Sequence, residues 1–304
     1  MKALVVGYGS IGMRHARVLA GLGAETAVVS RREVDHPQVF GSIADALSGF
    51  QPDYVVIASR TSEHGTDLAA LAEAGFIGRV LVEKPLFDTD VEVPENRFER
   101  IRVAYNMRFY AALLRFRELL QGRRVYSVTA YTGSYLPSWR PHMDYRETSS
   151  ARKTHGGGVL RELSHEIDYL LWMFGAWRRV AAIGGQFADL EIDTDDSFTL
   201  LFETAHVPAV TLQINYLDRT TRRDVLALTD AGSLRLDLIA GTVQLADGGI
   251  ETFTAERDDS YIAEHTAMMN DDDDVICSLD EGIDVMHLIL GAERAAHTGE
   301  WVVA

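Results

Sequence analysis

Cysteine is almost absent from this chain, and so are long apolar runs. The one cysteine, Cys277, cannot form a disulfide within the chain, which fits a reducing compartment. A helix that crosses a bilayer needs roughly 20 consecutive apolar residues, and no run approaches that length. No signal sequence precedes the first predicted strand, which begins by Ala3. We therefore expect a cytoplasmic protein with no membrane partner.

Positive charge is also scarce. Lys and Arg total 29 against 45 Asp and Glu, for a formal net charge of −16. Such a surface repels the phosphates of nucleic acids and anionic lipids, so nucleic acid is excluded as an expected partner. With 304 residues, the chain exceeds the size of a comfortable single core, and two domains are the first expectation.

The first motif is a glycine-rich turn between a strand and a helix. The apolar run 3–6 leads into Gly7-Tyr8-Gly9-Ser10-Ile11-Gly12. In a GxGxxG motif with this context, the first glycine permits the tight turn, the second lets a pyrophosphate approach, and the third lets the helix pack on the strand. A dinucleotide is thus expected on the backbone of residues 7–12.

The second predicted strand, 27–29, ends at Ser30-Arg31-Arg32. A fold that binds NAD usually places a carboxylate here, on the ribose of the adenosine. A hydroxyl followed by two guanidinium groups suits a 2′-phosphate instead, although two arginines in a solvated loop remain the alternative. The pattern favours NADP over NAD.

Two further buried-type strands, 53–58 and 80–82, alternate with a helix that ends at Gly75. This alternation predicts a parallel sheet whose ligand lies beyond the carboxyl ends of its strands. Ser59-Arg60-Thr61 and Glu83-Lys84-Pro85 stand at two of those ends. An irregular connection, a strand at 101–105 and a linking helix at 109–120 follow, which places the boundary near Gly122 and predicts domains of residues 1–121 and 122–304.

Alternating apolar and polar residues mark the second domain. Strands are predicted at 126–135, 179–187, 198–203, 209–216, 223–229 and 233–237. They indicate an open, mainly antiparallel sheet, so the fold class is α/β with a Rossmann domain followed by an α+β domain. Adjacent aspartates repel each other and make poor joint ligands, so the run 271–274 is expected to be a solvated loop and no metal is expected. A helix is predicted at 281–296.

Several motifs in this order resemble the Gfo/Idh/MocA oxidoreductases, which include relatives of glucose-fructose oxidoreductase and inositol dehydrogenase. The motifs cover nearly the whole chain: GYGSIGMRH at 7–15, Ser62-Glu63-His64, Glu83-Lys84-Pro85, Tyr105 to Phe109, Gly156-Gly157-Gly158 and His165 to Asp168. The resemblance implies an NAD(P)-dependent oxidoreductase that forms homodimers or homotetramers through its free sheet face. The residues expected to bind the cofactor are Gly7, Tyr8, Gly9, Ser10, Ile11, Gly12, Ser30, Arg31, Arg32, Ser59, Arg60, Thr61, His64, Glu83, Lys84 and Asn106.

After the three glycines, a single helix is predicted from Val159, with Glu162 and His165 one turn apart. An imidazole beside a carboxylate can move a proton near neutral pH, although a histidine with a purely structural role fits equally well. The resemblance implies that Lys84 and His165 are catalytic, with His165 as proton acceptor and Lys84 stabilising charge on the substrate oxygen. Many family members have an aspartate where this chain has Arg161, so the supporting acid is expected to be Glu162 or Asp168.

The segment 134–153 is expected to contact the substrate. Its aromatic rings suit sugars and its cations suit a carboxylate or phosphate, and the alternative is an exposed basic loop. Together with Lys84, Arg108 and His165, the expected substrate contacts are Tyr135, Trp139, Arg140, Tyr145, Arg146, Ser149 and Lys153. A sugar, sugar acid or nucleotide-linked sugar is the expected substrate.

Two other functions are compatible with the same resemblance. A relative that has lost catalysis could act as a dinucleotide-sensing regulator, which would need the glycines but not Lys84 and His165. A redox-neutral enzyme with a tightly held cofactor would use all of these residues. The retained lysine and histidine favour an enzyme.

Overall fold

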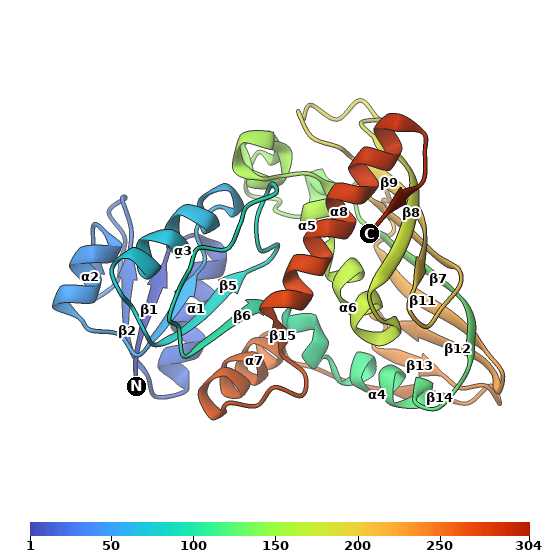
Figure 1. The fold of residues 1–304 in the computed structure, drawn as a ribbon, viewed down its shortest axis with the longest axis horizontal. Helices are drawn as coiled ribbons and strands as arrows, with labels where there is room; N and C mark the ends of the chain where they lie inside the picture. The colour runs from blue at the N-terminus through green and yellow to red at the C-terminus, as the bar shows by residue number, and fades with distance from the viewer. The chain divides into compact units, whose positions relative to one another are not determined.

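The computed structural model describes residues 1–304 and divides the chain into two compact units (Figure 1). Unit 1 contains residues 1–106 and 256–282, and unit 2 contains residues 107–255 and 283–304. The sequence predicted one crossing near Gly122, whereas the chain returns to unit 1 before its last helix. The returning segment had no clear periodicity, and its place depends on contacts with strands far away in sequence.

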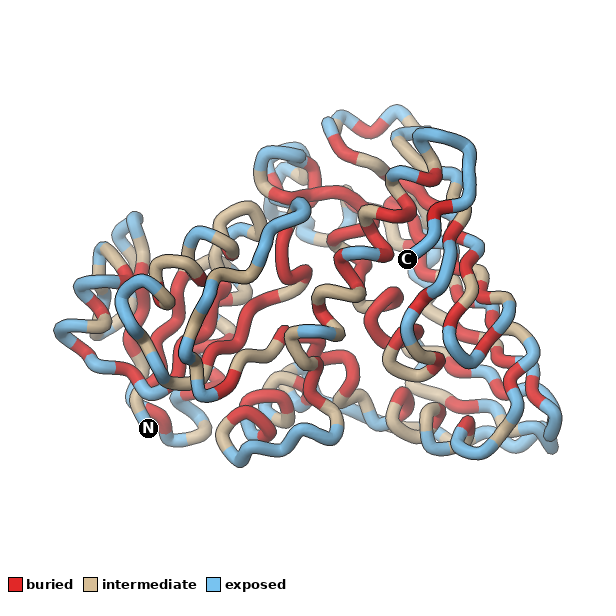
Figure 2. Tube along the Cα trace, viewed as in Figure 1, coloured by how far each residue is buried: buried red, intermediate tan, exposed pale blue.

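The core of unit 1 is a seven-stranded sheet in the order β15-β6-β5-β4-β1-β2-β3. All neighbouring pairs are parallel except β15 with β6. Residues 3–6 and 54–57 are buried because helices cover both faces of a parallel sheet (Figure 2). The predicted Rossmann domain is confirmed. Its strands are β1 (Lys2–Val6), β2 (Glu25–Val29), β3 (Val39–Phe40), β4 (Tyr54–Ile57), β5 (Arg79–Glu83), β6 (Arg100–Ala104) and β15 (Cys277–Ser278).

Four helices belong to unit 1: α1 (Ser10–Gly21), α2 (Ile43–Gly49), α3 (His64–Glu73) and α7 (Asp259–Asn270). α2 begins where the Ser42 hydroxyl accepts a hydrogen bond from the Asp45 amide. The connection 86–99 has no helix, as the sequence predicted. α7 was not predicted, and it packs against α1.

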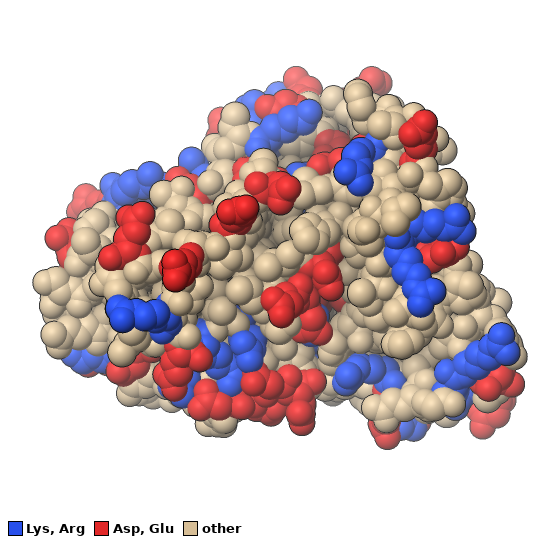
Figure 3. Space-filling view, in the orientation of Figure 1, with Lys and Arg blue, Asp and Glu red and all other residues tan.

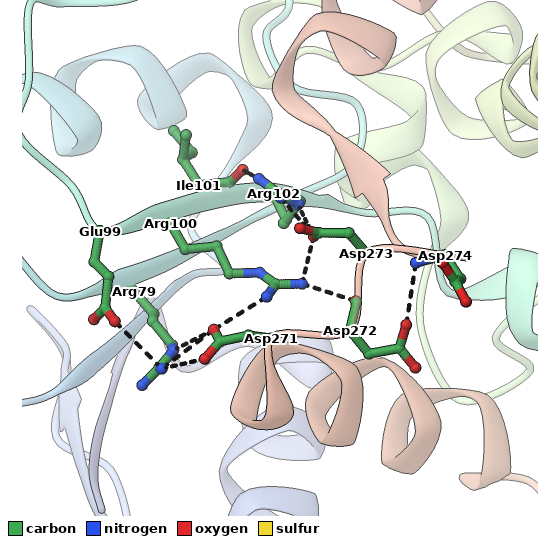
Figure 4. A network of polar contacts seen from close by, with 9 residues as sticks. All are labelled: Arg79, Glu99, Arg100, Ile101, Arg102, Asp271, Asp272, Asp273 and Asp274. Carbon is green, nitrogen blue, oxygen red and sulfur yellow. Dashed lines mark hydrogen bonds and ion pairs between the residues drawn. The ribbon is translucent and has the colours of Figure 1, made fainter.

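The aspartates 271–274 follow α7, and two of them form ion pairs with arginines of the sheet (Figure 4). Asp271 binds Arg79 at 2.9 Å and Arg100 at 3.1 Å, and Asp273 binds Arg100 at 2.6 Å. Arg102 also reaches Asp273. The expected solvated loop is therefore corrected: these carboxylates are half exposed, but they attach the end of α7 to β5 and β6. No group of His, Cys, Asp and Glu side chains suited to hold a metal ion is found in the 304 residues.

Unit 2 is built on a nine-stranded sheet in the order β14-β13-β12-β11-β7-β10-β9-β8-β16. Only β7 and β10 pair in parallel; the other pairs are antiparallel. The predicted, mainly antiparallel sheet is confirmed, with this one parallel pair. The strands are β7 (Val125–Gly133), β8 (Trp177–Gly185), β9 (Ser197–Thr204), β10 (Val210–Asn215), β11 (Arg222–Thr229), β12 (Gly232–Asp237), β13 (Thr242–Gln244), β14 (Ile250–Thr252) and β16 (Val302–Val303).

One face of this sheet packs against helices α4 (Ala111–Leu120), α5 (Val159–Glu162), α6 (Ser164–Phe174) and the later part of α8 (Leu279–Thr298) (Figure 1). Inward-facing residues such as Leu200 and Leu212 are fully buried. On the other face, Ile183, Leu201 and Leu228 are exposed by 73%, 41% and 40%. This alternation is that of a sheet with one packed face and one open face.

No helix of the structure combines the length and the apolar character needed to cross a membrane. On the face shown in Figure 3, basic side chains are interspersed with acidic ones and form no continuous basic stripe.

Candidate active site

The glycine loop of unit 1 has the geometry that a dinucleotide requires. Gly7 has a φ of +91°, and a Cβ added there would lie 2.6 Å from the Ala58 carbonyl oxygen. A Cβ on Gly12 would lie 2.0 Å from the Gly7 carbonyl oxygen, so the helix and strand pack closely only because both residues are glycine. A Cβ on Gly9 would meet nothing within 4 Å. The backbone at Gly9 is therefore open to an approaching group.

The N-terminus of α1 begins at this open position. Gly9 caps it without a side chain, and its first turn contains no acidic residue. The first N–H groups of a helix are donors with no partner inside the helix, and its dipole favours negative charge. The loop and helix thus offer the space and the N–H donors that a pyrophosphate requires.

At the end of β2, the side chains expected to select the cofactor are engaged with other groups. The Ser30 hydroxyl donates to the Arg32 carbonyl at 2.9 Å and accepts from the Arg32 amide at 3.1 Å. Arg31 forms an ion pair with Glu63 at 2.5 Å. This pair raises the pKa of the Arg31 guanidinium, chiefly through the hydrogen bond from Arg31 to Glu63. Glu63 was not among the predicted cofactor residues, because nothing in the sequence linked it to Arg31.

The end of β4 is held together by hydrogen bonds within unit 1. The Ser59 hydroxyl donates to Asp67 at 2.6 Å, and burial raises the pKa of that carboxyl. His64 is buried, with its Nδ1 at 3.2 Å from the carbonyl oxygens of both Pro85 and Leu86. Burial lowers the pKa of His64, so the ring is neutral at pH 7. His64 thereby supports the turn that follows Lys84.

Lys84 follows β5, at the same edge of the sheet as the glycine loop, and its peptide bond to Pro85 is cis. Glu83 is buried beside it, and its carboxylate accepts from the Lys84 amide at 3.0 Å and contacts His15 at 2.8 Å. Burial is the largest single effect on Glu83 and opposes its ionisation, but the interactions with His15 and Lys84 together outweigh burial and lower the pKa of the carboxyl. His15 ends the motif GYGSIGMRH, and this contact explains its place there.

Two other predicted cofactor residues have polar contacts within unit 1. The Asn106 amide donates to the hydroxyl of Ser260 in α7 at 2.7 Å. The Tyr8 ring lies edge-on to His36, with 5.6 Å between the ring centroids. Asn106 is buried and joins the end of β6 to α7.

In unit 2, the predicted single helix is in fact two. α5 ends at Glu162, Leu163 has φ −98° and ψ 30°, and α6 begins at Ser164. Because the helix breaks between them, Glu162 and His165 do not lie one turn apart on a single helix, as the sequence predicted. The Glu162 carboxylate accepts from the Ser150 hydroxyl at 2.7 Å. His165 lies in the first turn of α6 and is partly exposed.

Asp195, which the sequence did not indicate as part of this region, contacts the first residues of α5 through its carboxylate. Its carboxylate accepts from the Leu160 amide at 3.2 Å, and a Cβ on Gly158 would collide with it at 2.4 Å. Burial raises the pKa of Asp195. The glycine at 158, with φ +121°, is thus required by this close carboxylate.

Two acids near His165 in sequence are held by arginines. Asp168 and Arg108 are both 1% exposed and form a buried ion pair, with Nη2 to Oδ1 at 2.6 Å and Nε to Oδ2 at 3.0 Å. Glu166 is fully buried and pairs with Arg223 at 2.7 Å. A buried carboxylate needs such a partner, and this requirement accounts for Asp168 and Arg108 together.

The segment expected to bind the substrate forms short 3-10 turns. Trp139 donates to Ser134 at 2.7 Å and packs edge-on against Tyr216, while Arg219 lies over the Tyr135 ring at 4.2 Å. The other predicted contacts have varied surroundings. Arg146 pairs with Asp144 and Glu191, the Tyr145 hydroxyl accepts from the Glu191 amide, and Arg140, Ser149 and Lys153 are exposed.

Comparison with known families agrees with both units. Residues 1–102 match a family model described as an oxidoreductase family with an NAD-binding Rossmann fold, and residues 113–235 match the GFO/IDH/MocA C-terminal domain. The chain belongs to the Gfo/Idh/MocA family. The resemblance predicted from the motifs is confirmed, and the first unit is an NAD-binding Rossmann domain of an oxidoreductase family. No curated protein sequence matches.

Solved structures with this fold include several dehydrogenases. The WlbA dehydrogenase from Bordetella pertussis, in complex with NADH and UDP-GlcNAcA, is 21% identical, with a TM-score of 0.80 over 100% of this chain and 98% of that one. GenD2 from gentamicin A biosynthesis, in complex with NAD, is 22% identical, with a TM-score of 0.82 over 100% of this chain and 96% of that one. The scyllo-inositol dehydrogenase from Lactobacillus casei is 19% identical, with a TM-score of 0.79 over 100% of this chain and 98% of that one. At these identities the likeness establishes the fold.

Proposed function

We propose that this protein is an NAD(H)-dependent dehydrogenase or reductase that acts on a secondary hydroxyl or keto group of a sugar, sugar acid or nucleotide-linked sugar. The observation that carries the proposal is in unit 1, where the open glycine loop and the strand end bearing Lys84 share one edge of the sheet. The family membership, and the sugar ligands of structures with the same fold, support the substrate class.

The dinucleotide would supply the site for hydride transfer. The chain itself has to accept the hydroxyl proton and stabilise the charge that develops on the substrate oxygen. We assign His165 as the proton acceptor, because an imidazole titrates near neutral pH. We assign Lys84 as the donor to the substrate oxygen. The acid that supports His165 is Glu162 or Asp168; Asp168 also pairs with Arg108, and Glu162 also accepts a hydrogen bond from Ser150.

The test is a pair of variants, Lys84→Ala and His165→Ala, measured against a panel of sugar acids and nucleotide sugars. We expect turnover to fall by at least about 100-fold in each, because a charge-stabilising donor and an acid/base group each contribute about that much. NADH should bind both variants within about threefold of wild type, since the glycine loop is unchanged. Turnover near the wild-type rate in both variants would end this mechanism.

The expected preference for NADP is not supported by the family model or by the similar structures with bound NAD(H), and we propose NAD(H) instead. The surroundings of the loop after β2 give a physical reason. Arg31 is paired with Glu63, and the Ser30 hydroxyl is held by the backbone of Arg32. A 2′-phosphate would have to displace Glu63 from Arg31 and would be repelled by the carboxylate.

A further inference from the structure

Four buried side chains of unit 1 form an unbroken line of hydrogen bonds that ends beside Lys84. Glu83 contacts the His15 Nε2, the His15 Nδ1 contacts the His265 Nε2, and the His265 Nδ1 contacts the Tyr54 hydroxyl, each at 2.8 Å. The four residues come from β5, α1, α7 and β4. His15, His265 and Tyr54 are 0% exposed. We call this line the Glu83 relay.

When both imidazoles are neutral, only one placement of their protons gives every contact of the relay one donor and one acceptor. Burial keeps the pKa of His265 well below its ordinary value, and an ionised Glu83 can only accept. His15 must therefore carry its proton on Nε2, which leaves Nδ1 as an acceptor. His265 then donates from Nε2 and accepts the Tyr54 proton at Nδ1. The His265 Nε2–H group is thus the donor that satisfies the buried Nδ1 acceptor of His15.

The relay ends on the backbone of the lysine assigned to the substrate oxygen. The second oxygen of Glu83 accepts from the Lys84 amide at 3.0 Å. On the far side of the turn, the His64 ring faces the Pro85 and Leu86 carbonyls. The turn that carries Lys84 is therefore held from two directions by buried groups.

We propose that His265 is a positioning residue for Lys84, acting through His15 and Glu83. The proposal rests on the role of Lys84 in the proposed function. Without a donor at the position of the His265 Nε2, the buried Nδ1 of His15 loses its partner, and the His15 ring can reorient to find another. Glu83 then loses its partner and turns away, and the Lys84 amide loses its acceptor. Preorganised sites depend on such supporting contacts.

The test is a matched pair of substitutions, His265→Gln and His265→Asn. The Gln amide nitrogen falls near the position of Nε2 and can still donate to His15, whereas the shorter Asn amide falls near Nδ1 and cannot. We expect kcat to fall by about tenfold or more in His265→Asn, as for a small misplacement of a reacting group. We expect His265→Gln to stay within about threefold, with NADH affinity unchanged in both.

A second readout does not depend on turnover. Hydrogen exchange at the Lys84 amide, resolved by NMR, reports the bond to Glu83 directly. We expect faster exchange in His265→Asn than in wild type or His265→Gln. Faster Lys84 exchange in His265→Asn, together with a wild type that transfers no hydride to any substrate tested, would support the relay while rejecting the proposed function. Equal exchange and equal kcat in wild type and both variants, or equal impairment in Gln and Asn, would overturn the positioning role.

Tyr54→Phe keeps the test decisive if the His265 variants do not fold. It removes only the hydroxyl group that contacts His265, and it should also accelerate exchange at Lys84. Tyr169→Phe is the control, because Tyr169 is an equally buried phenol in unit 2 that lies outside the relay. Unchanged Lys84 exchange in Tyr54→Phe, or the same acceleration in Tyr169→Phe, would reject the proposal.

Discussion

Among single residues, Glu63 has the clearest expected effect on ligand choice. It lies at the carboxyl end of β4 and binds Arg31, which follows β2; β1 and its glycine loop lie between these strands. An exposed ion pair of this kind contributes little to stability. Its influence on a ligand is larger, since Glu63 adds negative charge next to the arginine that a 2′-phosphate would use.

We predict that Glu63→Gln improves the affinity for NADPH by about five- to tenfold, an effect of roughly 1 kcal/mol from removing one nearby like charge. NADH affinity should change by less than about twofold, because NADH lacks the added phosphate. Titration of both nucleotides by fluorescence measures the ratio. Arg31→Ala is the control and should remove the gain when combined with Glu63→Gln. An unchanged NADPH to NADH ratio in Glu63→Gln would exclude Glu63 as a selector.

At this scale the sequence predicted the glycine loop and the location of Lys84 at a strand end, because both depend on local spacing. It did not predict the partners of these residues. His15 meets His265 across 250 positions, and Arg31 meets Glu63 across 32. Such contacts are set by the sheet order and by the return of the chain, and neither is visible in a local pattern.

Among the elements, α7 shows most clearly how distant segments are joined. Its C-terminal end is attached to β5 and β6 by the ion pairs of Asp271 and Asp273, and α7 carries His265. Arg100 is 6% exposed, so the network has one buried member and several partly exposed ones. The carboxylates retain solvent contact and therefore avoid the full cost of burying charge.

We predict that Arg100→Met lowers the free energy of unfolding by about 2 kcal/mol, since charge-assisted hydrogen bonds of a buried guanidinium are lost. The hydrogen bond from Arg79, with a further one from Arg100, lowers the pKa of Asp271 below its ordinary 3.8. The stabilisation from ionised Asp271 is complete above its ordinary pKa and is lost as the pH falls through the lower pKa of the folded state. The difference in free energy of unfolding between variant and wild type, measured with urea, should therefore be smaller below pH 4 than at pH 7. A deficit that grows as the pH falls would contradict this account.

The helix break at Leu163 shows a limit of reading elements from periodicity. The apolar residues Leu160, Leu163 and Ile167 are buried, as predicted for one helix face. No glycine or proline marks the interruption in the sequence. Hydrogen bonds to Asp195 and Ser150 fix α5 separately from α6, and these partners lie 35 and 12 residues away in sequence, outside the helical pattern itself.

For the whole molecule, the open face of the unit 2 sheet is the surface that we propose for homo-oligomer formation. Ile183, Leu201 and Leu228 lie exposed on it beside threonines. We predict that Ile183→Asp with Leu201→Asp weakens self-association by more than about tenfold, because a charge buried without a partner is unfavourable. Sedimentation velocity measures the change. The control is Ile77→Asp, at a residue of unit 1 that is 64% exposed. A monomeric wild type would reject this surface, and so would equal association of the wild type, the double variant and the control.

At this scale composition and motif order were enough to predict a Rossmann domain and a second, mainly antiparallel sheet. The discontinuity of unit 1 was not predictable, because residues 256–282 hold their place through Asp271, His265 and Ser260, whose partners all lie within residues 1–106, more than 150 positions away in sequence.

The return of the chain to unit 1 also affects the order of folding. Arg100 and His15 belong to early segments, but their partners Asp271 and His265 are synthesised only after strands β7 to β14 of the unit 2 sheet. Contacts with such a large sequence separation form slowly, since loop closure must come first. A nascent chain therefore holds an unfinished first sheet, with β6 as an unprotected edge until β15 arrives, and this interval is when aggregation or chaperone binding is most expected.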